Sequence, residues 1–419
     1  MMRSRSLMAF LLIVYLATTY FFYASYVQGD FSIYYRAGQR VDSGRNLYLL
    51  DDNLYIYGPL LGIVMSLFAD IDQLLVSRVW LLSNIISTVT ACFIACKTYL
   101  RGQGCFGFLA LTGIVALGFS FRNNLGNGNV MAHVLLCVAL VIRLAPTSNS
   151  VFSLLVLPLI TIFTFEVKPY IALFLMVYLL YWKRYSVLAI CIPWALFLNL
   201  IYWAHAGSTY LNWVAALRLR AAGIQEGTDQ ATILVFASKI LPEHKLIGIS
   251  VALSLYTFIG LLVLSALMST NPKNPSVGLL VFSAAPILTV FSHGQDFLLS
   301  TLSLGVVILN SNRVSMGEIT KLFNISLALG LLINWTNQSV IPAFFAMALL
   351  ILILWQIKKI KWNLIVATVL FFLLSICLNF YIVDFFGDIQ YLVYNFQAML
   401  FGLSCLLVVY DSQRKSRVA

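Results

Sequence analysis

The sequence predicts an all-α integral membrane protein, built as a polytopic helix bundle in one chain. Of its 419 residues, 61% are hydrophobic and only 10% are charged, whereas soluble globular chains are about one-quarter charged. The mean hydropathy is +0.93. Apolar stretches of about 17–25 residues, the length of a membrane-crossing helix, recur along the whole chain. Together these observations exclude an ordinary soluble domain.

The apolar stretches divide into about 12–14 candidate spans, the range reflecting several segments that are short for a crossing. With both chain ends on the cytoplasmic side, the spans are expected at 7–26, 75–96, 106–121, 130–144, 151–166, 169–182, 186–205, 246–269, 276–292, 297–311, 322–337, 340–357, 363–383 and 391–410. The resulting bundle carries its polar segments in the connecting loops.

The distribution of charge supports this orientation. Of the 26 basic residues, the 16 on the cytoplasmic side are Arg3, Arg5, Lys97, Arg101, Arg143, Lys183, Arg184, Lys273, Arg313, Lys321, Lys358, Lys359, Lys361, Arg414, Lys415 and Arg417. Among the acids, only Glu318 and Asp411 lie there. Short basic loops mark the cytoplasmic face of membrane proteins. The net charge of +11 therefore indicates orientation, and no nucleic-acid partner is predicted.

Cysteine and histidine spacing predicts no metal centre. The seven Cys lie in spans or near the cytoplasmic side, and none shows metal-type spacing. The four His form neither an HxxxH pattern nor a cluster with carboxylates. No cofactor is predicted, although a catalytic divalent metal is compatible with the residues discussed below.

The chain is expected to form a single polytopic domain, 1–419, with two long loops on the outer face, 27–74 and 206–245. Loops of this length in compact proteins are usually functional or disordered, and their aromatics and amphipathic periodicity favour order. Within the first long loop, the apolar run 57–71 is short for a crossing. It is expected to form an interfacial or re-entrant helix with Pro59 in its first turn.

The first long loop opens with "GDFSIYYRAGQR" (29–40), where Asp30 has two interpretations. It could be the N-cap of an amphipathic helix, or a general base held at the membrane surface. Arg36 and Arg40 are four residues apart and share a helix face, and Arg45 follows a turn at Gly44. These arginines fit a solvated face or lipid headgroups, but also bidentate binding of phosphate oxygens.

Several further polar residues in predicted outer segments fit either a structural or a substrate-binding role. The tyrosines of the first long loop, Tyr34, Tyr35 and Tyr57 among them, suit an interfacial belt or stacking on sugar rings. "FRNNLGNGNV" (121–130), read as a turn between spans, supplies Asn127 and Asn129. "FTFEVKPY" (163–170) places Lys168 at a span's end, where charges are commonly functional. "FSHGQDF" (291–297) contributes His293 and Asp296.

In their order along the chain, these motifs resemble glycosyltransferase family 87. The resemblance covers the stretch from Asp30 to Pro59, then "LGNGNV", "EVKPY", "GTDQATI" and "SHGQDF", and ends near residue 300. It implies a GT-C-like membrane fold and an inverting transfer from a polyprenyl-phosphate sugar donor to a lipid-linked glycan acceptor. Asp30 would be the catalytic base.

The resemblance also assigns expected roles to the other residues. The departing donor phosphate would be held by Arg36, Arg40, Arg45, Lys168 and His293. Substrate would be bound by Tyr34, Tyr35, Tyr57, Asn127, Asn129 and Asp296. The expected setting is a bacterial inner membrane with the site on the periplasmic side. The sugar would be a hexose, glucose or mannose, added to O-antigen or a similar glycan as serotype-converting glucosyltransferases do.

Two other functions share parts of this pattern. A transporter or flippase of lipid-linked glycans is also polytopic, but it predicts internal inverted repeats, and the sequence shows no convincing repeat. An O-antigen polymerase shares the long outer loops and their arginines, and joins glycans carried on polyprenyl diphosphate.

Overall fold

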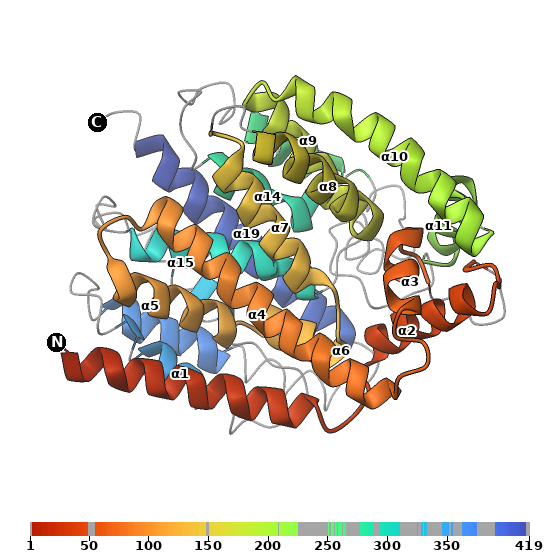
Figure 1. Cartoon of the computed structure of the whole chain (residues 1–419). Helices are drawn as coiled ribbons and strands as arrows, with labels where there is room; N and C mark the ends of the chain where they lie inside the picture. Colours follow the sequence, from red (N-terminus) through yellow and green to blue (C-terminus); the bar gives the residue numbers. More distant parts are fainter. Residues whose placement is uncertain are drawn as a thin grey trace. The chain divides into compact units, whose positions relative to one another are not determined.

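The structure is a computed structural model that describes residues 2–48, 55–147, 151–207, 209–224, 277–288, 294–310, 363–374 and 390–415, with scattered residues of 250–264 and 325–354. All regular structure within these ranges is helical, and they contain no strand (Figure 1). The all-α part of the predicted fold class is therefore confirmed.

Three described helices are long and apolar enough to cross a membrane: α1 (Met2–Tyr23), α4 (Gln73–Tyr99) and α10 (Tyr185–Ala206). A fourth candidate is the pair α5 (Gly104–Leu117) and α6 (Phe119–Asn127), which bends by 63° at the break between them. Only 17% of the apolar window of α1 and of α10 is buried, and large apolar side chains are exposed along both helices. Such surfaces are stable against lipid rather than water, so the chain is a helical membrane protein.

Shorter apolar helices coincide with further predicted spans. These helices are α7 (Met131–Leu144), α8 (Val151–Val167), α9 (Pro169–Tyr181), α14 (Val277–Leu288) and α15 (Leu298–Leu309). The C-terminal helix α19 (Gln390–Lys415) contains the last predicted span. The positions of these helices agree with the sequence, while the total of about 12–14 spans stays a prediction.

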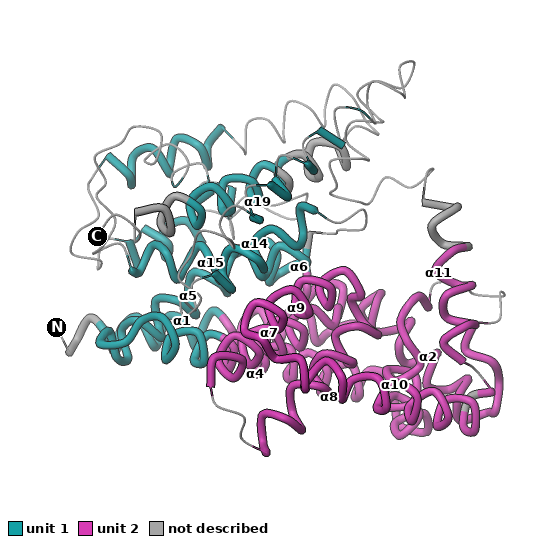
Figure 2. The backbone as a smooth tube through the Cα atoms, turned by 90° about the horizontal axis from the view of Figure 1, so that it is seen from above, with its two compact units in different colours: residues 1–15, 92–123, 228–419 teal, residues 16–91, 124–227 magenta. Residues whose placement is uncertain are grey.

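The chain separates into two compact units (Figure 2). Unit 1 contains residues 1–15, 92–123 and 228–419, and unit 2 contains residues 16–91 and 124–227. Unit 2 holds both the described part of the first long loop and the start of the second. The expectation of one continuous polytopic domain stays a prediction.

Aromatic packing builds the described core of unit 1. Phe119 of α6 contacts Phe401 of α19 edge to face, with ring centroids 5.3 Å apart, and both lie near Phe297. Unit 1 also has a polar contact, in which the Gln103 amide donates to the Leu309 carbonyl at 2.5 Å. This contact joins the start of α5 to the end of α15.

In unit 2, the first long loop folds into two helices, α2 (Gly29–Asp42) and α3 (Pro59–Ser66). Helix α2 is amphipathic, and its buried side includes Phe31, Tyr34 and Tyr35. Helix α3 has 8 residues and is about 12 Å long, too short to cross a bilayer. It begins with Pro59 at its first position, as predicted.

Close backbone contact joins these two helices. Gly38 of α2 lies against Met65 of α3, and a Cβ added at residue 38 would be 2.5 Å from the Met65 carbonyl carbon. No real side chain fits at that distance, so glycine is required here for packing. The two helices of the first long loop therefore form one compact element (Figure 1).

Replacing Gly38 by alanine is expected to lower stability by about 1–3 kcal/mol, because overpacking forces the backbones of α2 and α3 apart. Thermal unfolding of the detergent-solubilised chain would measure it. Gly29→Ala is the matched control, because residue 29 is in the same helix and a Cβ there meets no atom within 4 Å. Equal unfolding temperatures for the two variants would contradict the close α2–α3 contact.

Candidate functional site

Asp30 lies in the first turn of α2 and is half-buried. The N-cap of this helix is Gln28, so the interpretation of Asp30 as an N-cap is wrong. Instead, its Oδ2 accepts a hydrogen bond of 2.5 Å from Nδ2 of Asn129, 99 residues away in the sequence. Within the described residues this is the one hydrogen bond to the Asp30 carboxylate, and Oδ1 is left for another donor.

Asn129 is itself held in a fixed orientation. It is buried, and its Oδ1 accepts the backbone N–H of Met131 at 3.0 Å. Since the amide oxygen is occupied by a backbone donor, the amide nitrogen faces Asp30. Two residues that the sequence assigned to one site, as base and as substrate ligand, are therefore in direct contact.

A sharp turn at Gly128 places Asn129. Gly128 has φ +65°, and a Cβ there would lie 2.8 Å from Cβ of Phe31 and 2.9 Å from Cβ of Gln28. Both the left-handed conformation and this close approach favour glycine. The indole N–H of Trp80 donates to the Gly128 carbonyl at 2.7 Å. The turn therefore packs against the start of α2 and is hydrogen-bonded to α4.

The predicted turn over 121–130 is wrong for most of its length. Residues up to Asn127 belong to helix α6, and the turn is limited to the residues just before α7. Asn127, the last residue of α6, is partly exposed. The polar letters of "FRNNLGN" indicated a turn, but tertiary packing of Phe121 and Leu125, both buried, maintains the helix.

Gln28 fixes the chain where it enters α2. Its side-chain nitrogen donates to the carbonyls of Tyr23 and Tyr26 at 2.6 and 2.7 Å, and its oxygen accepts from the Ser77 hydroxyl at 2.5 Å. These bonds join the end of α1, the start of α2 and helix α4. Asp30, two residues later, is thus attached to a rigid support.

The predicted substrate-binding tyrosines are packed inside the first long loop. Tyr34, Tyr35 and Tyr57 are all buried. The Tyr34 hydroxyl donates to the Tyr57 hydroxyl at 3.0 Å, and the Tyr35 hydroxyl donates to the Ile71 carbonyl at 2.5 Å. In this structure these rings pack within the first long loop. Their contact with a sugar stays a prediction.

The arginines of the first long loop lie nearer the surface. Arg36 and Arg45 are exposed and Arg40 is half-buried. The Arg36 Nε reaches the Ser32 carbonyl and an Arg40 Nη the Leu47 carbonyl, each at 3.4 Å. These contacts are long for hydrogen bonds. Phosphate binding by these arginines stays a prediction.

Lys168 lies at the junction of two helices. It is the N-cap residue of α9, directly after α8, and is buried. Its ammonium lies 5.9 Å from the ring centroid of Tyr170, within the range of a cation–π contact. A buried cation at a helix junction keeps the predicted anion-binding role chemically reasonable.

The sequence pointed to Glu166, close to Lys168, as a charge at a span's end, but assigned it no role in the site. Glu166 is fully buried at the end of α8. Its carboxylate accepts hydrogen bonds from the Tyr202 and Tyr210 hydroxyls and, at 2.8 Å, from the backbone N–H of Leu60. The available signal was a carboxylate at a span's end, but the sequence did not reveal its partners.

The last two predicted site residues, His293 and Asp296, come from the stretch 291–297. Asp296 is buried in unit 1, in the short 3₁₀ helix Gly294–Phe297. The neighbouring Gln295 accepts a hydrogen bond of 3.1 Å from the Asn123 amide. His293 lies outside the described residues.

No group of three or more His, Cys, Asp and Glu side chains that could hold a metal ion is found in the described part of the chain. Neither the family models, the curated proteins nor the solved structures give a significant match to this chain. A carboxylate with one oxygen held and one open can accept a proton from a hydroxyl.

Buried tyrosines make the first long loop sensitive to alkaline pH. Burial is the main cause that raises the pKa of Tyr34 and of Tyr55 well above the ordinary value. The Tyr55 hydroxyl donates to the Gly58 carbonyl at 2.7 Å and accepts from the Gly62 N–H at 2.9 Å. The folded chain thus keeps these phenols neutral while the unfolded chain ionises them.

Stability is expected to fall as pH rises above about 10, because there the unfolded state binds fewer protons than the folded state. Each such tyrosine contributes a loss of about 1.4 kcal/mol per pH unit. Thermal unfolding measured between pH 8 and pH 11 checks this. Tyr55→Phe should unfold at lower temperature at pH 8, since it loses two hydrogen bonds, yet show a shallower decline. Identical slopes for both proteins would refute the assignment.

Proposed function

We propose that this chain is an inverting glycosyltransferase of the GT-C type. It moves a hexose from a polyprenyl-phosphate carrier to a lipid-linked glycan, on the periplasmic side of a bacterial inner membrane. The observation that supports the proposal is the Asp30–Asn129 pair, in which a fixed amide orients one carboxylate oxygen and leaves the other open.

The chemistry requires one base and no cofactor. Oδ1 of Asp30 would remove the proton from an acceptor hydroxyl as its oxygen attacks the anomeric carbon of the hexose. The new glycosidic bond forms while the bond from that carbon to the phosphate oxygen breaks, and the electron pair leaves with polyprenyl phosphate. Attack opposite the leaving group inverts the configuration. Because Asn129 holds the other oxygen, the base would be oriented before substrate arrives.

Departure of the phosphate requires stabilisation of its negative charge. Arg36 and Arg40 lie about two and about three turns beyond Asp30 on α2. Guanidinium groups bind phosphate oxygens in a bidentate manner. The polyprenyl tail would remain in lipid beside the apolar helices, so the donor's phosphate would meet the protein at the membrane boundary.

Asp30→Asn is expected to lower transfer by about 10²–10⁴-fold, the usual contribution of a general base, with the folded protein still present. Asp42→Asn is the matched control, an exposed carboxylate at the other end of the same helix. Mass and linkage analysis of the surface glycan from cells with each variant would give the readout. Wild type and Asp42→Asn should add one hexose per repeat, and Asp30→Asn should not.

Other glycan outcomes separate the rival functions. A change in chain length without an added hexose would indicate a polymerase, and loss of all surface glycan when the chain is removed would indicate a flippase. Full hexose addition by Asp30→Asn would reject Asp30 as the base.

Asn129→Ala removes the donor that orients Asp30. Since a hydrogen bond to a charged group contributes about 1.5–3 kcal/mol, kcat is expected to fall by about 10–150-fold, with the KM for the acceptor little changed. Asn123→Ala is the control. Asn123 is a nearby asparagine in α6, and its amide donates to Gln295 and not to Asp30. Steady-state transfer kinetics in membrane vesicles would compare them. A fall confined to KM would mean that Asn129 binds substrate instead.

A further inference from the structure

The carboxylate of Glu166 joins three separate segments of unit 2. Its donors come from the start of α3, from α10 and from α11 (Tyr210–Ile224), through Leu60, Tyr202 and Tyr210 respectively. The backbone carbonyl of Glu166 also accepts the N–H of Gly58 at 2.6 Å. Neither loop alone supplies these partners, because residues 58 and 60 belong to the first long loop and Tyr210 to the second.

Glu166 completes the N-terminus of α3. The N-cap of this helix, Gly58, has no side chain to accept a backbone N–H, and Pro59 has no N–H to offer. Leu60 therefore carries the first helical N–H that needs an acceptor, and Glu166 Oε2 is that acceptor. Without this carboxylate the first turn of α3 loses its cap.

The chain passes directly over Glu166 at Gly58. A Cβ on residue 58 would lie 2.5 Å from Cβ of Glu166. The combination of this contact with the two backbone hydrogen bonds leaves residues 58–60 little freedom to shift. Tyr57, the preceding residue, is fixed in consequence.

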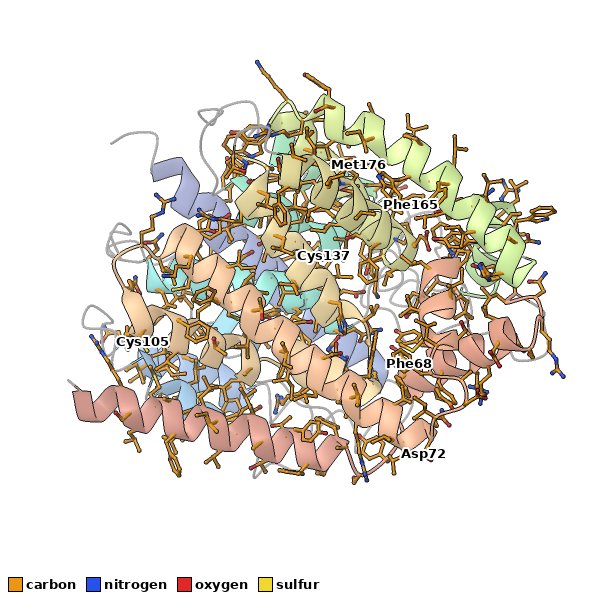
Figure 3. All side chains as sticks on the ribbon, in the orientation of Figure 1. Phe68, Asp72, Cys105, Cys137, Phe165 and Met176 are labelled. Atoms are coloured by element: carbon orange, nitrogen blue, oxygen red, sulfur yellow. The ribbon has the colours of Figure 1, made fainter. Side chains whose placement is uncertain are left out.

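Helix α11 is attached at the same place. Trp213 is buried, its indole N–H donates to the Ile56 carbonyl at 2.9 Å, and its ring packs edge to face on Phe165 at 5.4 Å. Phe165, labelled in Figure 3, precedes Glu166 on α8. The first turn of α11 is thus held both by Tyr210 on Glu166 and by Trp213 on residue 56.

A short chain of contacts leads from Glu166 to Asp30. The Tyr57 ring, next to Gly58, packs edge to face on Tyr34 at 4.9 Å, and the two hydroxyls are hydrogen-bonded. Tyr34 lies one helical turn after Asp30 on α2. A displacement of residue 58 would therefore act on the helix that carries Asp30.

We propose that Glu166 is a positioning residue that locks α11 to the first long loop and, through Tyr57 and Tyr34, sets the orientation of Asp30. It touches no substrate in this role. The link to Asp30 rests on the proposed function, whereas the locking of the two loops does not.

Hydrogen exchange of the full chain in lipid nanodiscs tests the lock directly. Glu166→Gln preserves size but replaces one acceptor oxygen by an N–H₂ group and leaves the other uncharged, so that it accepts more weakly. Peptides covering 55–62 and 209–218 should therefore both exchange about fivefold faster or more. Tyr210→Phe removes one hydroxyl and should loosen 209–218 while unfolding nothing else. Tyr178→Phe, a buried tyrosine of α9 that packs on Trp182, is the control and should change neither segment.

Unchanged exchange at 55–62 in Glu166→Gln overturns the inference. If that variant unfolds as a whole, Tyr210→Phe decides, and unchanged exchange at 209–218 there overturns the lock. Transfer kinetics test the link to Asp30, with kcat expected to fall about tenfold or more in Glu166→Gln at little changed KM. If both segments exchange faster in Glu166→Gln while kcat stays normal, the link from Glu166 to Asp30 is overturned. A wild type that transfers no hexose, with both segments loosened in Glu166→Gln, rejects the proposed function and supports the lock.

Discussion

A carboxylate withdrawn from water needs protein donors for its oxygens, and this requirement at Glu166 organises the polar part of unit 2. The donors come from three segments, so α3, α10 and α11 must meet at the end of α8. Gly58 allows the backbone to pass against the Glu166 side chain, and Trp213 closes over the neighbouring Phe165. The two long loops thereby share one anchoring point, and the tyrosines of the first loop pack outward from it toward α2.

The same logic of fixed partners applies to Asp30. Asn129 can orient it only because its own oxygen is held by the Met131 N–H, and Asn129 reaches α2 only because Gly128 turns tightly beside Phe31. Gln28 ties the start of α2 to α1 and α4. A half-buried carboxylate on so rigid a support, with arginines on the same helix, is the arrangement on which the proposed proton abstraction rests.

The apolar surfaces of α1 and α10 indicate the environment of the chain. Side chains such as Phe197 and Leu200 on α10 are largely exposed in the isolated chain, and lipid is the solvent in which that exposure is favourable. Helix α3 is too short to cross and lies with α2 in the first long loop. The Asp30–Asn129 contact therefore belongs to segments that adjoin the long membrane-crossing helices, whereas Glu166 also binds Tyr202 of the long helix α10.

The sequence by itself determined the helical membrane class, the positions of most described helices, and Pro59 as the start of α3, because composition, apolar length and proline chemistry act locally. It also named Asp30 and Asn129 as candidates, but not their contact. Only the tertiary structure decided that Asp30 follows an N-cap at Gln28, that residues up to Asn127 are helical, and that Tyr34, Tyr35 and Tyr57 are buried. It alone gave Glu166 its three donors. Hydrogen-bond partners 36 to 106 residues apart leave no periodic signal in a sequence, since they depend on how helices pack.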